Sequence, residues 1–196
     1  MSTDSELIQQ SKVTPSAFGG IYDRHAATVH RYAASRVGAT LADDVMSETF
    51  LVAFDKRHAF DDDQQSAGPW LLGIATNILH RLRRSEARRL KATMKAATPE
   101  VVPDEILAIM TRIDAESAVR SVAAALRQMP SIDRDTIMLF AISGLSYDEI
   151  AVAMRVPLGT VRSRLNRARR TLRAATGLTD TEDKGYGRAD TAARNA

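Results

Sequence analysis

Apolar residues recur at intervals of three and four along several short segments of this chain. Between residues 16 and 37, for example, this spacing links Phe18, Ile21, Val29 and Ala33. Such spacing places side chains on one face of a helix, whereas a half-buried strand needs strict alternation of apolar and polar residues. No stretch of Val, Ile, Thr and Tyr alternates for long enough to predict a strand, and aromatic residues are only 5% of the chain. The sequence therefore predicts an all-α fold.

Proline and glycine residues divide the helices into two groups, which indicates two small helical domains joined by a flexible linker. In the first domain, helices are expected over residues 16–37, 40–58 and 69–91. In the second domain, helices are expected over residues 115–129, 131–143, 146–154 and 159–175. The resulting boundaries are 14–91 for the first domain, 92–113 for the linker, 114–176 for the second domain and 177–196 for a disordered tail.

Local signals mark where some of these helices start. Thr40-Leu-Ala-Asp43 has the character of a helix cap, and Pro69 suits the first position of a helix because its missing N–H would be unpaired there. Within the linker, Pro99 and Pro103 interrupt the pattern, and the stretch Glu105–Ile113 is compatible with a short helix.

Several classes of protein are excluded by what the chain lacks. It contains no cysteine, so disulfides, thiolate zinc sites and cysteine nucleophiles are ruled out. Residues 1–12 are polar and acidic, without the apolar centre of a signal peptide. No apolar run approaches the ~20 residues that a membrane-spanning helix needs. We therefore expect a cytoplasmic protein with no membrane insertion.

The charges are unevenly distributed, although the formal net charge is only +3. Residues 43–63 hold seven acids against two basic residues. Residues 81–95 hold seven basic residues against one acid, and residues 155–173 hold seven arginines and no acid. Two basic blocks on one chain are typical of a protein that binds a polyanion, although solvated helix faces would give the same counts.

The end of the second domain has the pattern of a helix-turn-helix. Ser146-Tyr-Asp-Glu149 is a capping box that starts one helix, and a turn through Pro157 leads to the last helix. The inward arc of this last helix consists of Val161, Leu165, Ala168 and Leu172. All of its arginines lie outside that arc. This geometry places the start of the second helix in a DNA major groove, whereas the alternative is an ordinary surface helix with a charged outer face.

The helix expected over residues 40–58 carries an apolar residue within an acidic stripe. Its buried side includes Val45, Thr49 and Ala53, whereas the opposite side aligns Asp44, Glu48, Leu51 and Asp55. Asp44 and Glu48 are like charges one turn apart, which destabilises a helix by a few tenths of a kcal/mol. A leucine in such a stripe suggests docking against a basic helix of a partner, and the alternative is a solvated acidic face with one stray leucine.

The helix that starts at Pro69 separates an apolar side from a polar side. Its apolar side consists of Leu71, Ile74, Ala75, Ile78, Leu79 and Leu82. Its polar side carries Gly73, Thr76, Asn77, His80, Arg83 and Arg84, with Trp70 and Arg81 at the margins. Such donors suit a nucleic-acid backbone with unpaired bases. Trp70 could stack on a base, but a tryptophan near a helix start is more often a core residue. His80 has no second histidine or cysteine at metal-ligand spacing.

These motifs together resemble the extracytoplasmic-function (ECF) sigma factors, group IV of the sigma-70 family. Gly144-Leu-Ser-Tyr-Asp-Glu-Ile-Ala151 and Val156-Pro-Leu-Gly-Thr-Val-Arg-Ser-Arg-Leu165 are similar to region 4 of that family. Asp43-Asp-Val-Met-Ser-Glu-Thr-Phe50 and Trp70-Leu-Leu-Gly-Ile-Ala-Thr-Asn77 are similar to region 2, although Ser47 stands where the family usually has glutamine. The resemblance spans about residues 20–90 and 115–175.

The resemblance implies a protein that binds core RNA polymerase and directs promoter-specific initiation without catalysing a reaction. The residues implied to dock on the clamp helices of the polymerase β′ subunit are Asp44, Glu48, Leu51 and Asp55. The implied −10 element residues are Asn77, Thr76, His80, Arg81, Arg83 and Arg84, and the loop over residues 58–68 would help to capture a flipped base. The implied −35 element residues are Thr160, Arg162, Ser163, Arg164, Arg167 and Arg170.

The expected partners are core RNA polymerase, including its β flap, promoter DNA and an anti-sigma factor. No cofactor, metal or small-molecule substrate is expected. One rival hypothesis is a hydrolase with a divalent metal held by His58 and Asp61–Asp63, although three adjacent acids cannot all point at one ion from a helix. Another is a stand-alone DNA-binding regulator, which would leave the stripe around Leu51 and the polar face around Asn77 without a role.

Overall fold

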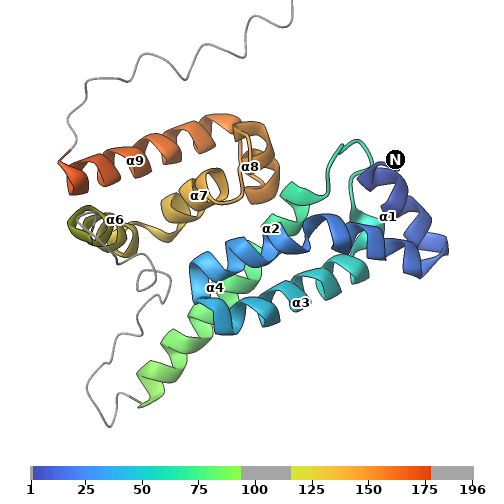
Figure 1. Cartoon of the computed structure of the whole chain (residues 1–196), viewed down its shortest axis with the longest axis horizontal. Coiled ribbons are helices and arrows are strands. Elements are labelled where there is room, and N and C mark those ends of the chain that lie inside the picture. Colours follow the sequence, from blue (N-terminus) through green and yellow to red (C-terminus); the bar gives the residue numbers. More distant parts are fainter. Residues whose placement is uncertain (1, 94–115, 178–196) are drawn as a thin grey trace, which may run out of the picture.

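The computed structural model describes residues 2–93 and 116–177, and every regular element in these ranges is a helix. The first group, in blue to green in Figure 1, has long helices α2, α3 and α4 packed side by side, with α1 at one end. Its elements are α1 (Asp4–Val13), the 3₁₀ turn η1 (Pro15–Phe18), α2 (Gly19–Val37), α3 (Ala39–Asp55), the 3₁₀ turn η2 (Arg57–Ala59) and α4 (Gly68–Thr93). The all-α prediction is confirmed for the described residues.

The long helices of the first group bury the faces that their apolar spacing predicts. Ile21, Val29 and Ala33 of α2 are buried, as are Leu71 and Leu79 of α4. On α3 the buried side is Val45, Thr49, Phe50 and Ala53. Because these faces meet, the opposite sides of α3 and α4 are left to carry the acidic stripe and part of the polar face.

The second group consists of four helices in yellow to red. They are α6 (Glu116–Gln128), α7 (Ser131–Ala141), α8 (Tyr147–Met154) and α9 (Leu158–Thr176). The predicted capping box is present at the start of α8, where Ser146 and Glu149 each accept a hydrogen bond from the other's backbone N–H. Arg155 ends α8 in the left-handed conformation at φ 53° and turns the chain toward α9. Val161, Leu165 and Ala168 of α9 are fully buried, as the inward arc predicts.

Two features of the first group differ from the sequence prediction. The polar segment at the N-terminus forms α1, which a capping box of Thr3 and Glu6 starts. Thr40 does not cap a helix, because α3 begins at Ala39 with Gly38 in the N-cap position at φ 78°. A glycine at φ 78° turns the chain sharply enough to start α3 directly after α2. The linker helix at Glu105–Ile113 and the disordered tail are predictions that lie outside the described residues.

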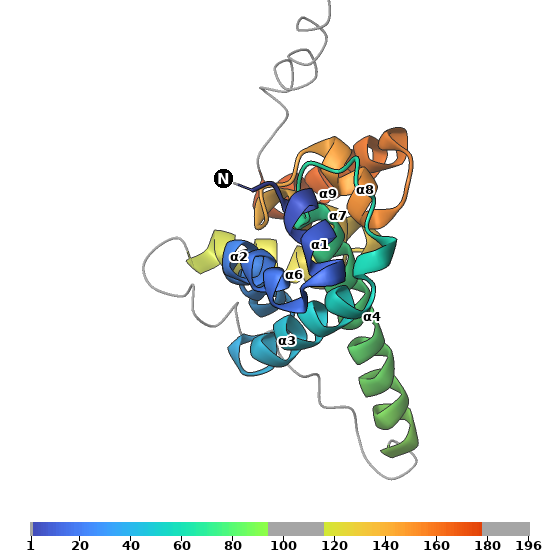
Figure 2. The same ribbon diagram turned by 90° about the vertical axis from the view of Figure 1, so that its right-hand side faces the viewer.

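The two groups pack directly against each other. Helix α8 lies against α4, and Figure 2 shows the second group seated on the first beside the α4 ribbon. At Gly73 the approach is so close that a Cβ atom would lie 2.4 Å from the carbonyl oxygen of Ala153. Buried apolar side chains from both groups form one continuous cluster. The polar face of α4 is therefore partly an internal surface.

Candidate partner and nucleic-acid interfaces

The acidic stripe of α3 lies on the outside of the first group. Leu51 is 68% exposed, and Asp44 and Asp55 beside it are exposed as well. Glu48 is half-buried because it pairs with Arg81 of α4. An exposed leucine flanked by free carboxylates offers both apolar contact and charge to a basic helix. All four residues of the stripe thus lie on one helix face, with Glu48 already engaged.

Asn77 is the exposed polar residue at the centre of the α4 face. It lines two neighbouring hollows. One, of about 250 Å³, also includes Lys56, Ile74 and Arg81. The other, of about 350 Å³, includes Phe60, Asp61, Gln64, Trp70 and, from α8, Val152 and Arg155. The loop between α3 and α4 and the polar face of α4 therefore do meet around Asn77, with residues of the second group against them.

Three of the residues predicted to contact DNA on α4 are occupied by internal contacts. Thr76 is 6% exposed, donates to Leu72 O and shares a 2.9 Å hydrogen bond with the hydroxyl of Tyr32. His80 bonds to Asp135 of α7, and Arg83 donates to the backbone oxygen of Arg36. Arg81 and Arg84, like Asn77, are exposed. In this arrangement the accessible part of the predicted set is Asn77, Arg81 and Arg84.

Trp70 is half-buried and packs its ring against Phe60, with 5.1 Å between the ring centroids. This edge-to-face pair links the start of α4 to the preceding loop. Trp70 thus packs within the domain, as a core residue does, and it also lines the hollow beside Asn77.

The acidic loop Asp61–Asp63 is tied back to α1. Lys12 lies 3.7 Å from the Asp62 carboxylate, and Ser5 donates to the Asp62 carbonyl. Asp61 accepts hydrogen bonds from the Asp63 N–H and from Gln64. Lys12 offsets part of the negative charge of this loop, and the hydrogen bonds to Asp61 fix its conformation.

Asp4 anchors α1 and is almost completely buried. Its carboxylate accepts hydrogen bonds from the Ala67 N–H at 2.8 Å and from Arg24 at 2.8 Å, and it lies 2.6 Å from His25. Burial alone would raise the pKa of Asp4, but the bonds from Ala67, Arg24 and His25 outweigh it and hold this pKa below its ordinary value. Asp4 thereby fixes the residue that precedes α4.

The outer face of α9 holds two kinds of predicted DNA contact. Arg162, Ser163 and Arg170 are exposed. Thr160 and Arg164 are half-buried, and Arg164 lies 3.9 Å from the sulfur of Met154. Arg167 forms two hydrogen bonds with Asp133 of α7, which raise the pKa of its guanidinium. The recognition face is therefore a mixture of free and anchored side chains.

A buried ion pair joins the two groups, and the sequence reasoning did not identify it. Asp135 of α7 bonds to Arg36 of α2 and to His80 of α4, and the side chains of Asp135 and Arg36 are 0% and 1% exposed. Burial would raise the pKa of Asp135, but the bond from His80 and the charge of Arg36 hold it below its ordinary value. One signal was available, because Arg36 lies three residues after Ala33 on the inward face of α2.

The described residues contain no group of three or more acids and histidines that could hold a metal ion. Among the helices described in 2–93 and 116–177, none has the length and apolar content to cross a membrane.

Family models match both halves of the chain. Residues 21–89 match the model "Sigma-70 region 2", and residues 120–172 match "Sigma-70, region 4". The chain is 36% identical over 157 residues to the ECF RNA polymerase sigma factor SigL of Mycobacterium tuberculosis, which covers 78% of this chain and 85% of SigL. It is 26% identical to the ECF sigma factor SigW of Bacillus subtilis, with 88% of this chain and 96% of SigW covered.

Solved structures share the fold. CnrH, in its complex with the cytosolic domain of CnrY, is 27% identical and superposes with a TM-score of 0.63 over 88% of this chain and 96% of CnrH. RpoE from Bartonella quintana, in complex with the anti-sigma factor NepR, is 22% identical with a TM-score of 0.63 over 83% of this chain and 98% of RpoE.

Proposed function

The chain belongs to the ECF RNA polymerase sigma factors of the sigma-70 family. On this premise we propose which of its surfaces bind core polymerase and which bind promoter DNA. Members of this family are regulatory DNA-binding proteins and not enzymes. The protein therefore binds core RNA polymerase and promoter DNA and directs promoter-specific initiation. The residues proposed for each step lie in two domains, 14–91 and 114–176.

The stripe of α3 is the surface that seats on the β′ clamp helices of core polymerase. The observation that carries this assignment is the 68% exposure of Leu51 between the free carboxylates Asp44 and Asp55. An apolar side chain of this size gains about 1.5–3 kcal/mol when a partner buries it fully. The surrounding carboxylates select a basic partner and exclude acidic ones.

The α4 face around Asn77 captures the −10 element. Its exposed amide can donate to and accept from a base edge, and Trp70 and Asp61 border space for an unpaired base once Val152 and Arg155 of α8 move away. Arg81 and Arg84 extend this face with cations for the backbone. Thr76, as a buried partner of Tyr32, supports the face from within. His80 joins the face when Asp135 of the second domain moves away, whereas Arg83 lies at its edge, bonded to the Arg36 backbone oxygen within the first domain.

Helix α9 reads the −35 element with Thr160, Arg162, Ser163 and Arg164 at its first turns. Arg170 lies farther along and suits a backbone phosphate. Arg167, bound to Asp133 at 3.0 and 2.7 Å, holds a fixed orientation and presents the rest of its guanidinium to the DNA backbone. The second domain also supplies the contact with the β flap.

We place the protein in the cytoplasm and expect an anti-sigma partner. CnrH, which shares the fold at 27% identity, is bound in its solved structure by the cytosolic domain of another protein. A protein partner of this kind for the present chain would compete for the surfaces that polymerase and promoter use.

The polymerase-binding assignment is tested by Leu51→Asp. Because the leucine is exposed, the variant should fold as the natural chain does and lose affinity for core polymerase by at least about tenfold. The matched control is Val13→Asp, the same kind of change at an 87% exposed position of α1. Affinity is measured by titrating labelled chain with core polymerase, and circular dichroism checks folding. Full affinity of the Leu51→Asp variant would refute the assignment.

A further inference from the structure

The second domain covers part of the α4 face to which we assign the −10 element. Ala153 of α8 lies on Gly73, and Val152 and Arg155 close the hollow that contains Trp70 and Asn77. We propose that Asp135 is a latch that holds the free protein in this closed state, so that the −10 surface opens only when α7 and α8 leave α4. The inference rests on the proposed role of α4 and adds how that role is controlled.

The first support is the set of partners of Asp135. Each of its carboxylate oxygens bonds to the first domain, Oδ1 to Arg36 and Oδ2 to His80. The neighbouring Asp133 provides a contrast, since it bonds to Arg167 within its own domain. Because Arg36 and His80 both belong to the first domain, moving α7 away breaks both hydrogen bonds of this carboxylate, which is 0% exposed in the closed state.

The second support is the steric fit at Gly73. A Cβ atom there would lie 2.4 Å from the Ala153 carbonyl oxygen and 3.2 Å from its carbonyl carbon. Backbone atoms cannot move aside as a flexible side chain can. The close packing of α8 on α4 therefore depends on the absence of a side chain at residue 73.

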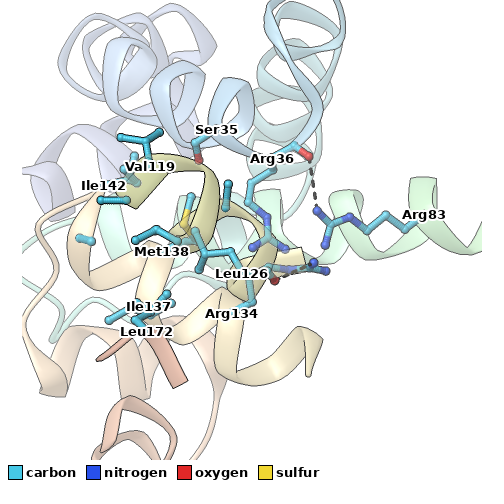
Figure 3. A pocket seen from close by; sticks show the side chains of 14 residues that line it. Ser35, Arg36, Arg83, Val119, Leu126, Arg134, Ile137, Met138, Ile142 and Leu172 are labelled. Carbon is cyan, nitrogen blue, oxygen red and sulfur yellow. Dashed lines mark hydrogen bonds between the residues drawn. The ribbon is translucent and has the colours of Figure 1, made fainter. Parts of the chain in front are cut away.

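The third support is that the interface is incompletely packed, as a reversible closure requires. A hollow of about 390 Å³, lined mainly by the second domain, is bordered by Ser35, Arg36 and Arg83 of the first domain, and Figure 3 shows Arg36 pointing into it from α2 beside Leu126 and Met138. Within the described residues, Nε and Nη1 of Arg36 are buried without a hydrogen-bond partner. Buried donors without a partner lower the stability of the closed state, so a partner can open it at modest cost.

The chemistry of the latch also suits a competition with DNA. Asp135 places a carboxylate between Arg36 and His80, at the edge of the basic end of α4. A phosphate oxygen makes the same charge-assisted hydrogen bonds. Opening thus returns the Arg36 guanidinium and the His80 ring to a surface that faces a polyanion, and the latch keeps both bonded to Asp135 until then.

The test compares Asp135→Asn and Gly73→Ala with the control Asp148→Asn, which changes an exposed aspartate of α8. Asp135→Asn leaves Arg36 without a counter-charge, and Gly73→Ala introduces the clash with the Ala153 backbone although alanine favours the helix more than glycine does. The chain has no cysteine, so Ala27→Cys and Ala174→Cys allow one spin label in each domain. Double electron–electron resonance spectroscopy then measures the distribution of distances between the two spin labels.

The natural chain and Asp148→Asn should give one narrow, short distance, whereas Asp135→Asn and Gly73→Ala should give broader and longer distributions. As a second readout, Asp135→Asn in the free chain should bind a single-stranded −10 oligonucleotide, taken from a promoter on which the holoenzyme initiates, at least about tenfold more tightly. Initiation by core polymerase with the natural chain tests the proposed function separately. If the natural chain initiates but both variants keep the short distance, the latch is wrong and the proposed function stands.

Discussion

At the scale of single residues, the two aspartates of α7 have different consequences for the surfaces around them. Asp133 holds Arg167 of α9 in place, and Asp135 joins α7 to α2 and α4. Both are buried acids on one short helix, and only their partners distinguish them. The arginines of α9 differ in the same way, because Arg167 is anchored whereas Arg162 and Arg170 are exposed. These differences lead to separate expectations for base reading and phosphate binding.

Two promoters are compared, one with the −35 sequence that the protein selects and one with that sequence scrambled. Arg162→Ala should weaken binding to the first promoter by about 1–3 kcal/mol more than binding to the second, because this side chain lies in the first turns of α9. Arg170→Ala is the matched change farther along α9 and should weaken binding to both promoters alike. Competition binding of the polymerase–sigma complex to the two promoters measures this difference. Equal losses for Arg162→Ala on the two promoters would assign it to a phosphate.

At the scale of elements, apolar spacing predicted the helices whose buried face is continuous. Helices α2, α4 and α9 bury the residues that this spacing selects, such as Ile21, Leu79 and Leu165. Helix α1 was missed because few apolar residues mark its inward face, and its docking depends on the buried acid Asp4. The stripe of α3 was predictable because it lies on one helix. The pairing of Arg36 with Asp135 was not, since residues 99 apart are brought together only by tertiary packing.

The docking of α1 is testable through Asp4→Asn. At pH 7 this change leaves Arg24 without its buried counter-charge and removes a carboxylate oxygen that bonds to His25, and it should lower the free energy of unfolding by about 3 kcal/mol. The pKa of Asp4 is lowered in the folded protein, so its contribution is present above the ordinary value of 3.8 and disappears as the pH falls through the folded value.

The difference between the natural chain and Asp4→Asn should therefore narrow below about pH 4, as measured by urea unfolding across a pH series. Asp23→Asn, at an exposed position of α2, is the control and should leave the curve unchanged. A constant difference down to pH 3 would show that Asp4 does not act through its charge.

At the scale of the whole molecule, acidic and basic residues are concentrated on different helices, and they meet where Arg81 of α4 pairs with Glu48 of α3. The acidic stripe around Leu51 lies on α3, whereas exposed arginines lie on α4 and on α9 of the other domain. Both domains contribute to one continuous core, and the second domain rests on the α4 face. In this arrangement the proposed polymerase surface is exposed, whereas only part of the proposed promoter surface is.

Promoter binding by the complex with core polymerase should weaken steeply with salt, because each phosphate that is neutralised releases counterions. The logarithm of the affinity should fall linearly with the logarithm of the salt concentration, by about 0.9 for each phosphate contacted. Replacing Arg170 by alanine should reduce that slope by about 1, as measured by filter binding over a salt series. An unchanged slope would remove Arg170 from the backbone contacts.

The most direct measurement of the central claim is transcription from a promoter library by core polymerase freed of other sigma factors, with and without the purified protein. The account predicts that transcripts start at discrete sites only when the protein is present, that the selected promoters share sequences in the −35 and −10 regions, and that Leu51→Asp abolishes this selection. Transcripts that start at random positions, or at the same positions without the protein, would contradict it.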